Sequence, residues 1–156
     1  MWFRVSSKEF STNGNRGNRR ALEELVESGR RPGLLGYIGG TPVGWVSVAP
    51  RSEFGRVERS PILKPVDQEK VWAIVCFYID RHHRGNGVAS KLLRAAVDYA
   101  AARGARVIEG YPIDVQKRKS VASAELFVGT VDMFAGAGFV EVERRSPTRP
   151  IMRYRV

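Results

Sequence analysis

A short glycine-containing motif constrains the fold of this chain more than any other feature. The motif, Arg84-Gly85-Asn86-Gly87-Val88-Ala89, follows the apolar segment Val71 to Ile79, which is typical of a buried strand, and opens a predicted amphipathic helix from about Gly87 to Arg103. A helix N-terminus presents unpaired N–H groups and the positive end of the helix dipole. Gly85 and Gly87 have no side chain that would keep an anion at a distance. The pattern predicts a strand–turn–helix unit that binds a pyrophosphate.

Two familiar phosphate-binding loops compete for this motif. A P-loop ends in Gly-Lys-Ser/Thr, whereas Gly87 is followed by Val88 and Ala89, and this excludes it. A dinucleotide-binding fingerprint needs three glycines, and the third position here is Ser90. Glu109 nevertheless lies at roughly the spacing of the acidic residue that binds a ribose in that fingerprint. An NAD-type dinucleotide binder therefore stays open as an alternative.

The R-x-x-G-x-A pattern from Arg84 to Ala89 resembles the pyrophosphate-binding motif of the GNAT family of N-acetyltransferases. Ala135-Gly136-Ala137-Gly138-Phe139 is similar to the end of that family's last helix. Val75-Cys76-Phe77 and Glu109-Gly110-Tyr111-Pro112-Ile113-Asp114 resemble a particular bacterial branch. The resemblance implies the acyl-CoA N-acyltransferase fold and transfer of an acetyl group from acetyl-coenzyme A to a primary amine of a small molecule or peptide.

The resemblance also implies which residues hold the co-substrate. The backbone amides from Gly85 to Ser90 would hold the pyrophosphate, with Arg84 as a neighbouring cation. The edge groups of Phe77, Tyr78 and Ile79 would pair with the amides of the pantetheine arm. The cofactor-binding residues expected are therefore Phe77, Tyr78, Ile79, Arg84, Gly85, Asn86, Gly87, Val88, Ala89 and Ser90.

Acetyl transfer to an amine benefits from a base for the amine and an acid for the departing thiolate. The family's acid is commonly a Tyr in the last helix, and the matching residue here is Phe134. Glu109 and Tyr111 lie two residues apart on one face of a predicted strand. If that face lines the substrate-binding cleft, desolvation would raise the pKa of Glu109 toward that of a useful general base. Tyr111 would then be the proton donor for the thiolate. The alternative is that Glu109 pairs with an arginine.

Phe134 also supports a second function class, because its ring cannot donate a proton. A non-enzymatic coenzyme A-binding or regulatory module is therefore the alternative to an acetyltransferase.

Composition limits the remaining classes. The net charge of +10 favours anionic partners, but no nucleic-acid-binding motif is present, so nucleic acid is not the expected partner. One cysteine and two adjacent histidines predict no metal site. No apolar run is long enough to span a bilayer and the N-terminus does not resemble a signal peptide, so we expect a cytoplasmic protein without membrane association. A homodimer stays open.

The 156 residues predict one domain, residues 1–156. We expect a mixed α/β fold: a mostly antiparallel central sheet with one parallel strand–helix–strand unit, flanked by helices. A doubly wound domain would need several such units. The expected strands are Trp2–Val5, Leu34–Ile38, Val43–Ala49, Val71–Ile79, Arg106–Tyr111, Phe139–Arg144 and Ile151–Val156. The expected helices are Arg19–Ser28, Gly87–Arg103 and Thr130–Ala137. The expected connections are Phe10–Asn18, Arg51–Lys70 and Pro112–Gly129, the last with a helical turn near Val121–Phe127.

Overall fold

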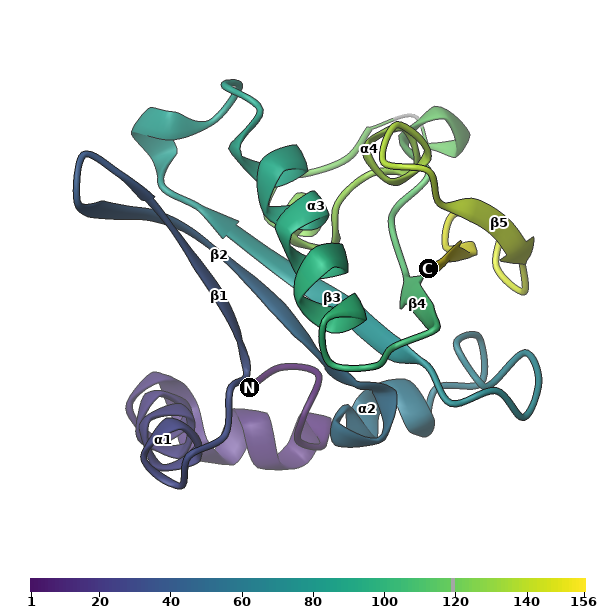
Figure 1. Cartoon of the computed structure of the whole chain (residues 1–156). Helices are drawn as coiled ribbons and strands as arrows, with labels where there is room; N and C mark the ends of the chain where they lie inside the picture. Colours follow the sequence, from purple (N-terminus) through teal and green to yellow (C-terminus); the bar gives the residue numbers. More distant parts are fainter. Residues whose placement is uncertain (119) are drawn as a thin grey trace.

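A six-stranded mixed sheet forms the centre of the molecule in a computed structural model that describes residues 1–118 and 120–156 (Figure 1). The strand order is β1-β2-β3-β4-β6-β5, and every neighbouring pair is antiparallel except β3 and β4. This arrangement confirms the predicted fold class. The strands are β1 (Gly33–Ile38), β2 (Thr41–Pro50), β3 (Trp72–Ile79), β4 (Val107–Gly110), β5 (Val140–Glu143) and β6 (Ile151–Arg155).

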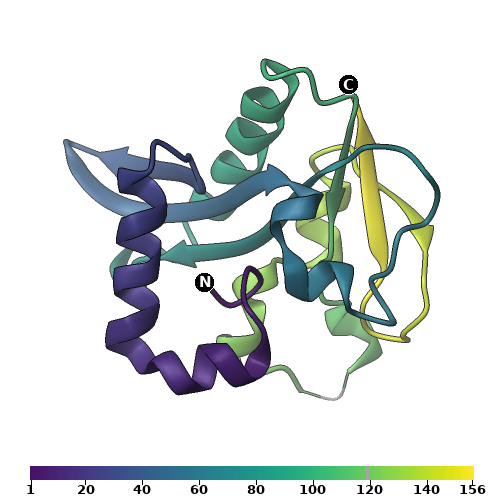
Figure 2. The same cartoon turned by 90° about the horizontal axis from the view of Figure 1, so that it is seen from below.

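Helices cover both faces of this sheet. The α-helices are α1 (Ser7–Glu27), α2 (Gly55–Glu58), α3 (Val88–Ala101) and α4 (Val131–Ala135), and the short 3₁₀ helices are η1 (Arg51–Glu53), η2 (Arg81–His83), η3 (Val115–Lys117) and η4 (Ser123–Val128). The side chains of α3 and α4 pack on one face, where Leu93, Ala96 and Phe134 are fully buried. On the other face, Phe54 and Val57 pack with Tyr111. Figure 2 shows α1 and α2 on the side of the sheet opposite α3.

The first two strands form the predicted hairpin. Gly39 and Gly40 occupy its turn with φ of 54° and 79°, values that a residue with a Cβ rarely adopts. The helix predicted from Gly87 and the short helix near Thr130 are also confirmed within a few residues. The same holds for the four strands predicted after Lys70, which correspond to β3, β4, β5 and β6. Thr130 caps α4, since its side chain accepts a hydrogen bond from the N–H of Met133 at 3.3 Å.

The parallel pair separates along its length. Residues Trp72 to Ile74 of β3 pair with Ile108 to Gly110 of β4, where β4 ends. β3 continues to Ile79 and keeps β2 as its partner on the other side. In the described part of the chain, no strand pairs with the β4-facing edge of β3 beyond Ile74. This edge therefore offers backbone donors and acceptors to another molecule.

Two predictions near the N-terminus are wrong. Residues Trp2–Val5 form a turn instead of a strand, closed by the N–H of Arg4 donating to the carbonyl oxygen of Met1 at 2.8 Å. Residues Phe10–Asn18 belong to α1 instead of a loop. The helix bends at Gly14 (φ 58°), where Asn18 Nδ2 donates to the carbonyls of Phe10 and Gly14. The predicted connection over 112–129 includes residue 119, which lies outside the described residues.

Candidate active site

The glycine turn before α3 has the geometry of an anion-binding loop. Gly85 and Gly87 have φ of 77° and 72°, in the left-handed region that glycine adopts without strain. Gly87 is the N-cap of α3 and has no side chain with which to cap it. The first-turn N–H groups of this 14-residue helix therefore have no intrahelical or N-cap side-chain partner. The guanidinium of Arg84 turns back toward the strand, where its Nε donates to the carbonyl oxygen of Ile79 at 3.1 Å.

A groove of about 440 Å³ runs from this turn along the unpaired edge of β3. Eight of the ten predicted cofactor-binding residues line it, and Asn86 and Ser90 are the two that do not. Phe77 is buried beneath the groove, whereas the side chain of Tyr78 is 58% exposed. The residues that line the groove on the strand and turn side are Phe77, Tyr78, Ile79, Arg84, Gly85, Gly87, Val88 and Ala89.

The opposite wall of the groove comes from two segments that the sequence predicted to be helical, a turn near Val121–Phe127 and a short helix over Thr130–Ala137. It consists of η4 and the start of α4, with Phe127, Gly129, Thr130 and Met133 among the lining residues. The predicted helical turn near Val121–Phe127 was the local signal for this wall. Its contact with β3 depends on the tertiary fold and has no signature in the local pattern.

Glu109 and Tyr111 do not line this groove. Glu109 is fully buried on the opposite side of β4, where its carboxylate accepts a hydrogen bond from the Tyr111 hydroxyl at 2.7 Å. Two guanidiniums also bond to it: Arg51 Nη1 at 3.2 Å and Arg153 Nε at 2.9 Å. Arg51 Nη1 donates to the Tyr111 hydroxyl as well, at 3.0 Å. The arrangement corresponds to the alternative in which Glu109 pairs with arginines.

Burial has a direct consequence for Tyr111. Desolvation, reinforced by the adjacent Glu109 carboxylate, raises the pKa of the Tyr111 phenol well above its ordinary value. A phenol with a raised pKa is a weaker proton donor. The geometry that joins Glu109 to Tyr111 therefore makes the pair less suited to acid catalysis than their positions on a strand suggested.

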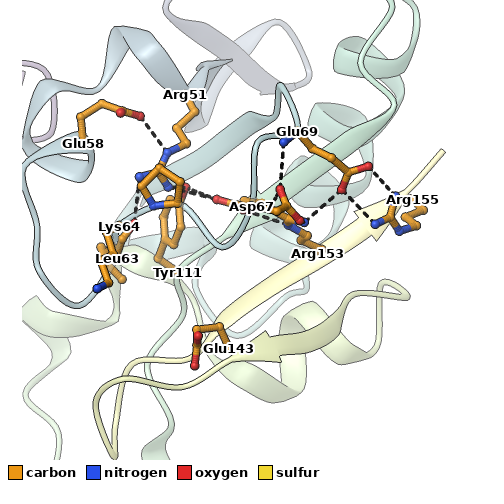
Figure 3. A network of polar contacts seen from close by, with 12 residues as sticks. Arg51, Glu58, Leu63, Lys64, Asp67, Glu69, Tyr111, Glu143, Arg153 and Arg155 are labelled. Atoms are coloured by element: carbon orange, nitrogen blue, oxygen red, sulfur yellow. Dashed lines mark hydrogen bonds and ion pairs between the residues drawn. The ribbon is translucent and has the colours of Figure 1, made fainter.

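The two arginines that bond to Glu109 have further carboxylate partners nearer the surface, which Figure 3 labels. Arg153, only 4% exposed at its side chain, also donates from Nη2 to Asp67 at 3.0 Å. Arg155 bonds to Glu69 at 2.9 Å, and Arg51 Nε bonds to Glu58 at 2.7 Å. These contacts join the connection between β2 and β3 to β4 and β6. The network therefore holds a long connection against the sheet.

Phe134, the residue at the position of the family's usual acid, is part of the core. Its ring is fully buried and lies 6.2 Å from the Phe77 ring and 4.9 Å from the Phe139 ring, in edge-to-face geometry. It is not among the residues that line the groove. Phe134 thus fixes α4 beside β3 and supplies no polar group there.

A mixed sheet whose parallel pair separates beside a glycine turn and a helix N-terminus defines the acyl-CoA N-acyltransferase fold. The family model for the GNAT acetyltransferases matches residues 1–127, which is most of the chain. The chain therefore belongs to the GNAT family of acetyltransferases, whose members use acyl-coenzyme A. No curated protein sequence matches it.

Solved structures share the fold at low sequence identity. A ribosomal-protein-alanine N-acetyltransferase from Brucella melitensis superposes with a TM-score of 0.55 at 17% identity, covering 90% of this chain and 78% of that one. The yncA protein of Salmonella typhimurium, solved with its cofactor acetyl-CoA, gives 0.57 at 20% identity, with 91% and 74% covered. Ard1 from Thermoplasma volcanium gives 0.52 at 14% identity, with 88% and 79% covered. At these identities the likeness concerns the fold alone.

Within residues 1–118 and 120–156, no group of three or more His, Cys, Asp or Glu side chains is arranged to hold a metal ion. None of the helices in this described part of the chain is both long and apolar enough to cross a bilayer.

Proposed function

We propose that this protein transfers an acetyl group from acetyl-coenzyme A to a primary amine. The observation that carries the proposal is the continuity of one groove, about 440 Å³ in volume, from the left-handed glycine turn to the unpaired edge of β3. The turn suits a pyrophosphate, and the strand edge suits the two amides of a pantetheine arm. The family to which the chain belongs supports the same co-substrate.

The reaction places simple demands on the acceptor side of the groove. The amine nitrogen attacks the thioester carbonyl carbon, the C–S bond breaks, the amine loses a proton and coenzyme A leaves as a thiolate that gains one. Only about one lysine-like amine in a few thousand is neutral at pH 7. The wall built by η4 and α4 would exclude water from the thioester and hold the neutral amine against it.

The roles of Glu109 as general base and Tyr111 as proton donor stay hypotheses. Both oxygens of Glu109 bond to guanidiniums, so a base there would act only through a rearranged network or a water. The thiolate has another proton source in water, because the ordinary pKa of a thiol, about 8.5, is near neutrality. A site that only positions the amine and the thioester is consistent with Phe134 in place of a tyrosine.

Calorimetry with acetyl-coenzyme A and with NAD tests the cofactor. We expect acetyl-coenzyme A to bind with one site per chain and NAD to give no heat of binding. Binding of NAD without binding of coenzyme A would reject the proposal and restore the dinucleotide alternative.

A thiol-release assay over a broad panel of amines tests the reaction. We expect at least one amine class to accelerate release of coenzyme A. The alternative, a non-enzymatic coenzyme A-binding module, is favoured by the buried Phe134 and by the ion-paired Glu109. It predicts tight coenzyme A binding with only slow thioester hydrolysis that no amine accelerates.

A further inference from the structure

A second cavity adjoins the cofactor groove at Phe127. It has a volume of about 410 Å³, and Phe127 lines both spaces. Three arginines line this cavity, Arg56, Arg118 and Arg149, against a single carboxylate, Glu125. Apolar side chains complete its walls, among them Trp2, Phe3, Ile62 and Leu63. The cavity is therefore strongly basic at one part of its lining and apolar at another.

Among the described residues, Arg118 is the only one of these three arginines that has a carboxylate counter-ion. Arg118 pairs with Glu125 at 2.5 Å. Within residues 1–118 and 120–156, neither Arg56 nor Arg149 has a carboxylate oxygen within the 4.0 Å of an ion pair. Arg149 Nη2 donates to the carbonyl oxygen of Tyr111 at 3.0 Å, and the Arg56 guanidinium stacks 3.7 Å from the centre of the Trp2 ring. Both guanidiniums are thus held in place without being neutralised.

Several N–H groups of these two side chains are also unsatisfied. Arg56 Nε, Arg56 Nη2 and Arg149 Nε have no acceptor among the described residues, and because these three atoms are closed off from solvent, an anion would reach them only after the side chains move. Desolvation by burial lowers the pKa of Arg149, and it lowers the pKa of Arg56 together with the neighbouring charge of Arg59. A cation that is partly removed from water and has no counter-ion destabilises a protein. Two such cations beside one cavity would be stabilised by an anion that binds in the cavity.

We propose that this cavity binds the carboxylate of the amine acceptor, so that the substrates are amines that also carry a carboxylate, such as amino acids or peptides. The inference rests on the proposed acetyl transfer. A planar carboxylate matches the fork of donors on a guanidinium, and Arg56 and Arg149 would each contribute a charged hydrogen bond. The acceptor would extend over Phe127, with its amine at the thioester and its carboxylate between the arginines.

Kinetics with matched acceptors test the specificity. We would compare a graded series of ω-amino carboxylates with their carboxamides and with aminoalkyl phosphates in the thiol-release assay. A charged hydrogen bond predicts that kcat/KM for the carboxylate exceeds that for the amide by about tenfold to a hundredfold, mainly through KM. Equal kcat/KM for carboxylates and amides would overturn the proposal. A preference for the phosphates would assign the cavity to a phosphate instead and would equally reject the carboxylate.

Arginine variants locate the effect. Arg149→Gln and Arg56→Gln should each remove most of the preference for carboxylates while leaving KM for acetyl-coenzyme A unchanged. Arg149 also supports the backbone at Tyr111, so Arg56→Gln is the safer variant if Arg149→Gln fails to fold. The matched control is Arg16→Gln, which removes the same charge from an exposed position on α1. A preference that survives in Arg56→Gln, or disappears equally in Arg16→Gln, would contradict the assignment.

A measurement without turnover separates this inference from the proposed function. Arginine Nε–Hε resonances of the ¹⁵N-labelled protein would be followed during titration with glutarate. Saturable shifts of Arg56 and Arg149 in the parent protein, with the Arg56 shift lost in Arg149→Gln, support the anion site even if no amine is acetylated. Absence of these shifts in a protein that acetylates amines overturns the anion site and leaves the acetyltransferase proposal intact.

Discussion

The ring of Phe134 lies directly against the backbone of Gly110, the last residue of β4. A Cβ atom on Gly110 would lie 2.7 Å from Phe134 Cζ, far inside van der Waals contact. Gly129 bounds the same ring from another side, where a Cβ would lie 2.9 Å from Cε2. Two glycines therefore make room for one aromatic ring at the point where β3 and β4 separate. This contact couples the end of the parallel pair to the helix that forms one wall of the groove.

Gly110→Ala should destabilise the fold. The added methyl overlaps the Phe134 ring, and overpacking of this kind costs about 1–3 kcal/mol of the free energy of unfolding. Urea denaturation followed by circular dichroism measures the loss. In a double variant, Phe134→Leu should relieve the overlap, so that the two substitutions together cost less than the sum of their separate effects. Strict additivity would show that the ring and the glycine are not coupled.

Gly87→Asp should abolish binding of coenzyme A, whereas Gly87→Asn should weaken this binding far less. Asn and Asp both tolerate the left-handed conformation that Gly87 adopts at φ 72°, so the two variants differ mainly in charge. A carboxylate beside the pyrophosphate site repels the ligand and competes for the N–H groups of α3. Calorimetry with acetyl-coenzyme A gives the two affinities. Similar affinities for Gly87→Asp and Gly87→Asn would argue against a pyrophosphate at this turn.

Glu109→Gln should act mainly on stability. The substitution removes the buried counter-ion that Arg51 and Arg153 share. Each guanidinium keeps a half-exposed carboxylate partner, so the loss should stay below the roughly 3–5 kcal/mol that removing one partner of an isolated buried pair costs. The free energy of unfolding from urea denaturation tests this expectation.

The general-base hypothesis for Glu109 predicts a different result for the same variant. In addition to any loss of stability, turnover of the folded variant would fall by about 10²–10⁴-fold while coenzyme A binding stays near that of the parent protein. Tyr111→Phe is a useful companion, because it removes one hydrogen bond to Glu109 without removing the charge. The rate of thiol release, measured across neutral and alkaline pH at a temperature where the variant is folded, separates the structural role of Glu109 from the general-base role. Full activity of the folded Glu109→Gln variant would reject the general-base hypothesis.

Asp67 should contribute stability that disappears in acid. Its hydrogen bonds from Arg153 are the main cause that lowers the pKa of this carboxyl to about 2 in the folded protein. The ordinary value is about 3.9, so the unfolded chain binds the proton first, and the contribution is full above about pH 5 and is lost as the pH falls toward 2. Asp67→Asn should therefore unfold with a shallower dependence on pH in this window. Asp98→Asn, on the exposed side of α3, is the matched control for the loss of one carboxylate.

The thiol of Cys76 should resist alkylation in the native protein. Burial raises its pKa to about 11, and the thiolate is the reactive form. At pH 8, iodoacetamide should react at least about a hundredfold more slowly with the native protein than with the urea-unfolded chain. Mass spectrometry over time measures both rates. Rapid native modification that acetyl-coenzyme A suppresses would instead place the thiol in the groove.

The parallel strand–helix–strand unit could be predicted from the sequence because its signals are local. An apolar run, two glycines in a turn and a periodic helix each depend on residues a few positions apart, and β3, the turn and α3 appear where these patterns placed them. The start of α1 had a local signal as well: Ser6 and Glu9 form a Ser-x-x-Glu capping pattern, and Ser6 accepts from the N–H of Glu9 at 3.1 Å. The residues that follow are rich in Ser, Asn and Gly, which have low helix propensity, so the local pattern predicts a loop there.

The surroundings of Glu109 were decided only by the tertiary structure. Its two guanidinium partners lie 58 and 44 residues away in the chain. Contacts between residues so far apart produce no local sequence pattern from which they could be predicted. Strand alternation correctly placed Glu109 and Tyr111 on one face, but which face meets the groove depends on how β4 packs between β3 and β6. The same holds for Arg56 and Arg149, which come together across a cavity because separate connections cover one face of the sheet. Local sequence determines which elements form, whereas long-range packing determines which side chains share a site.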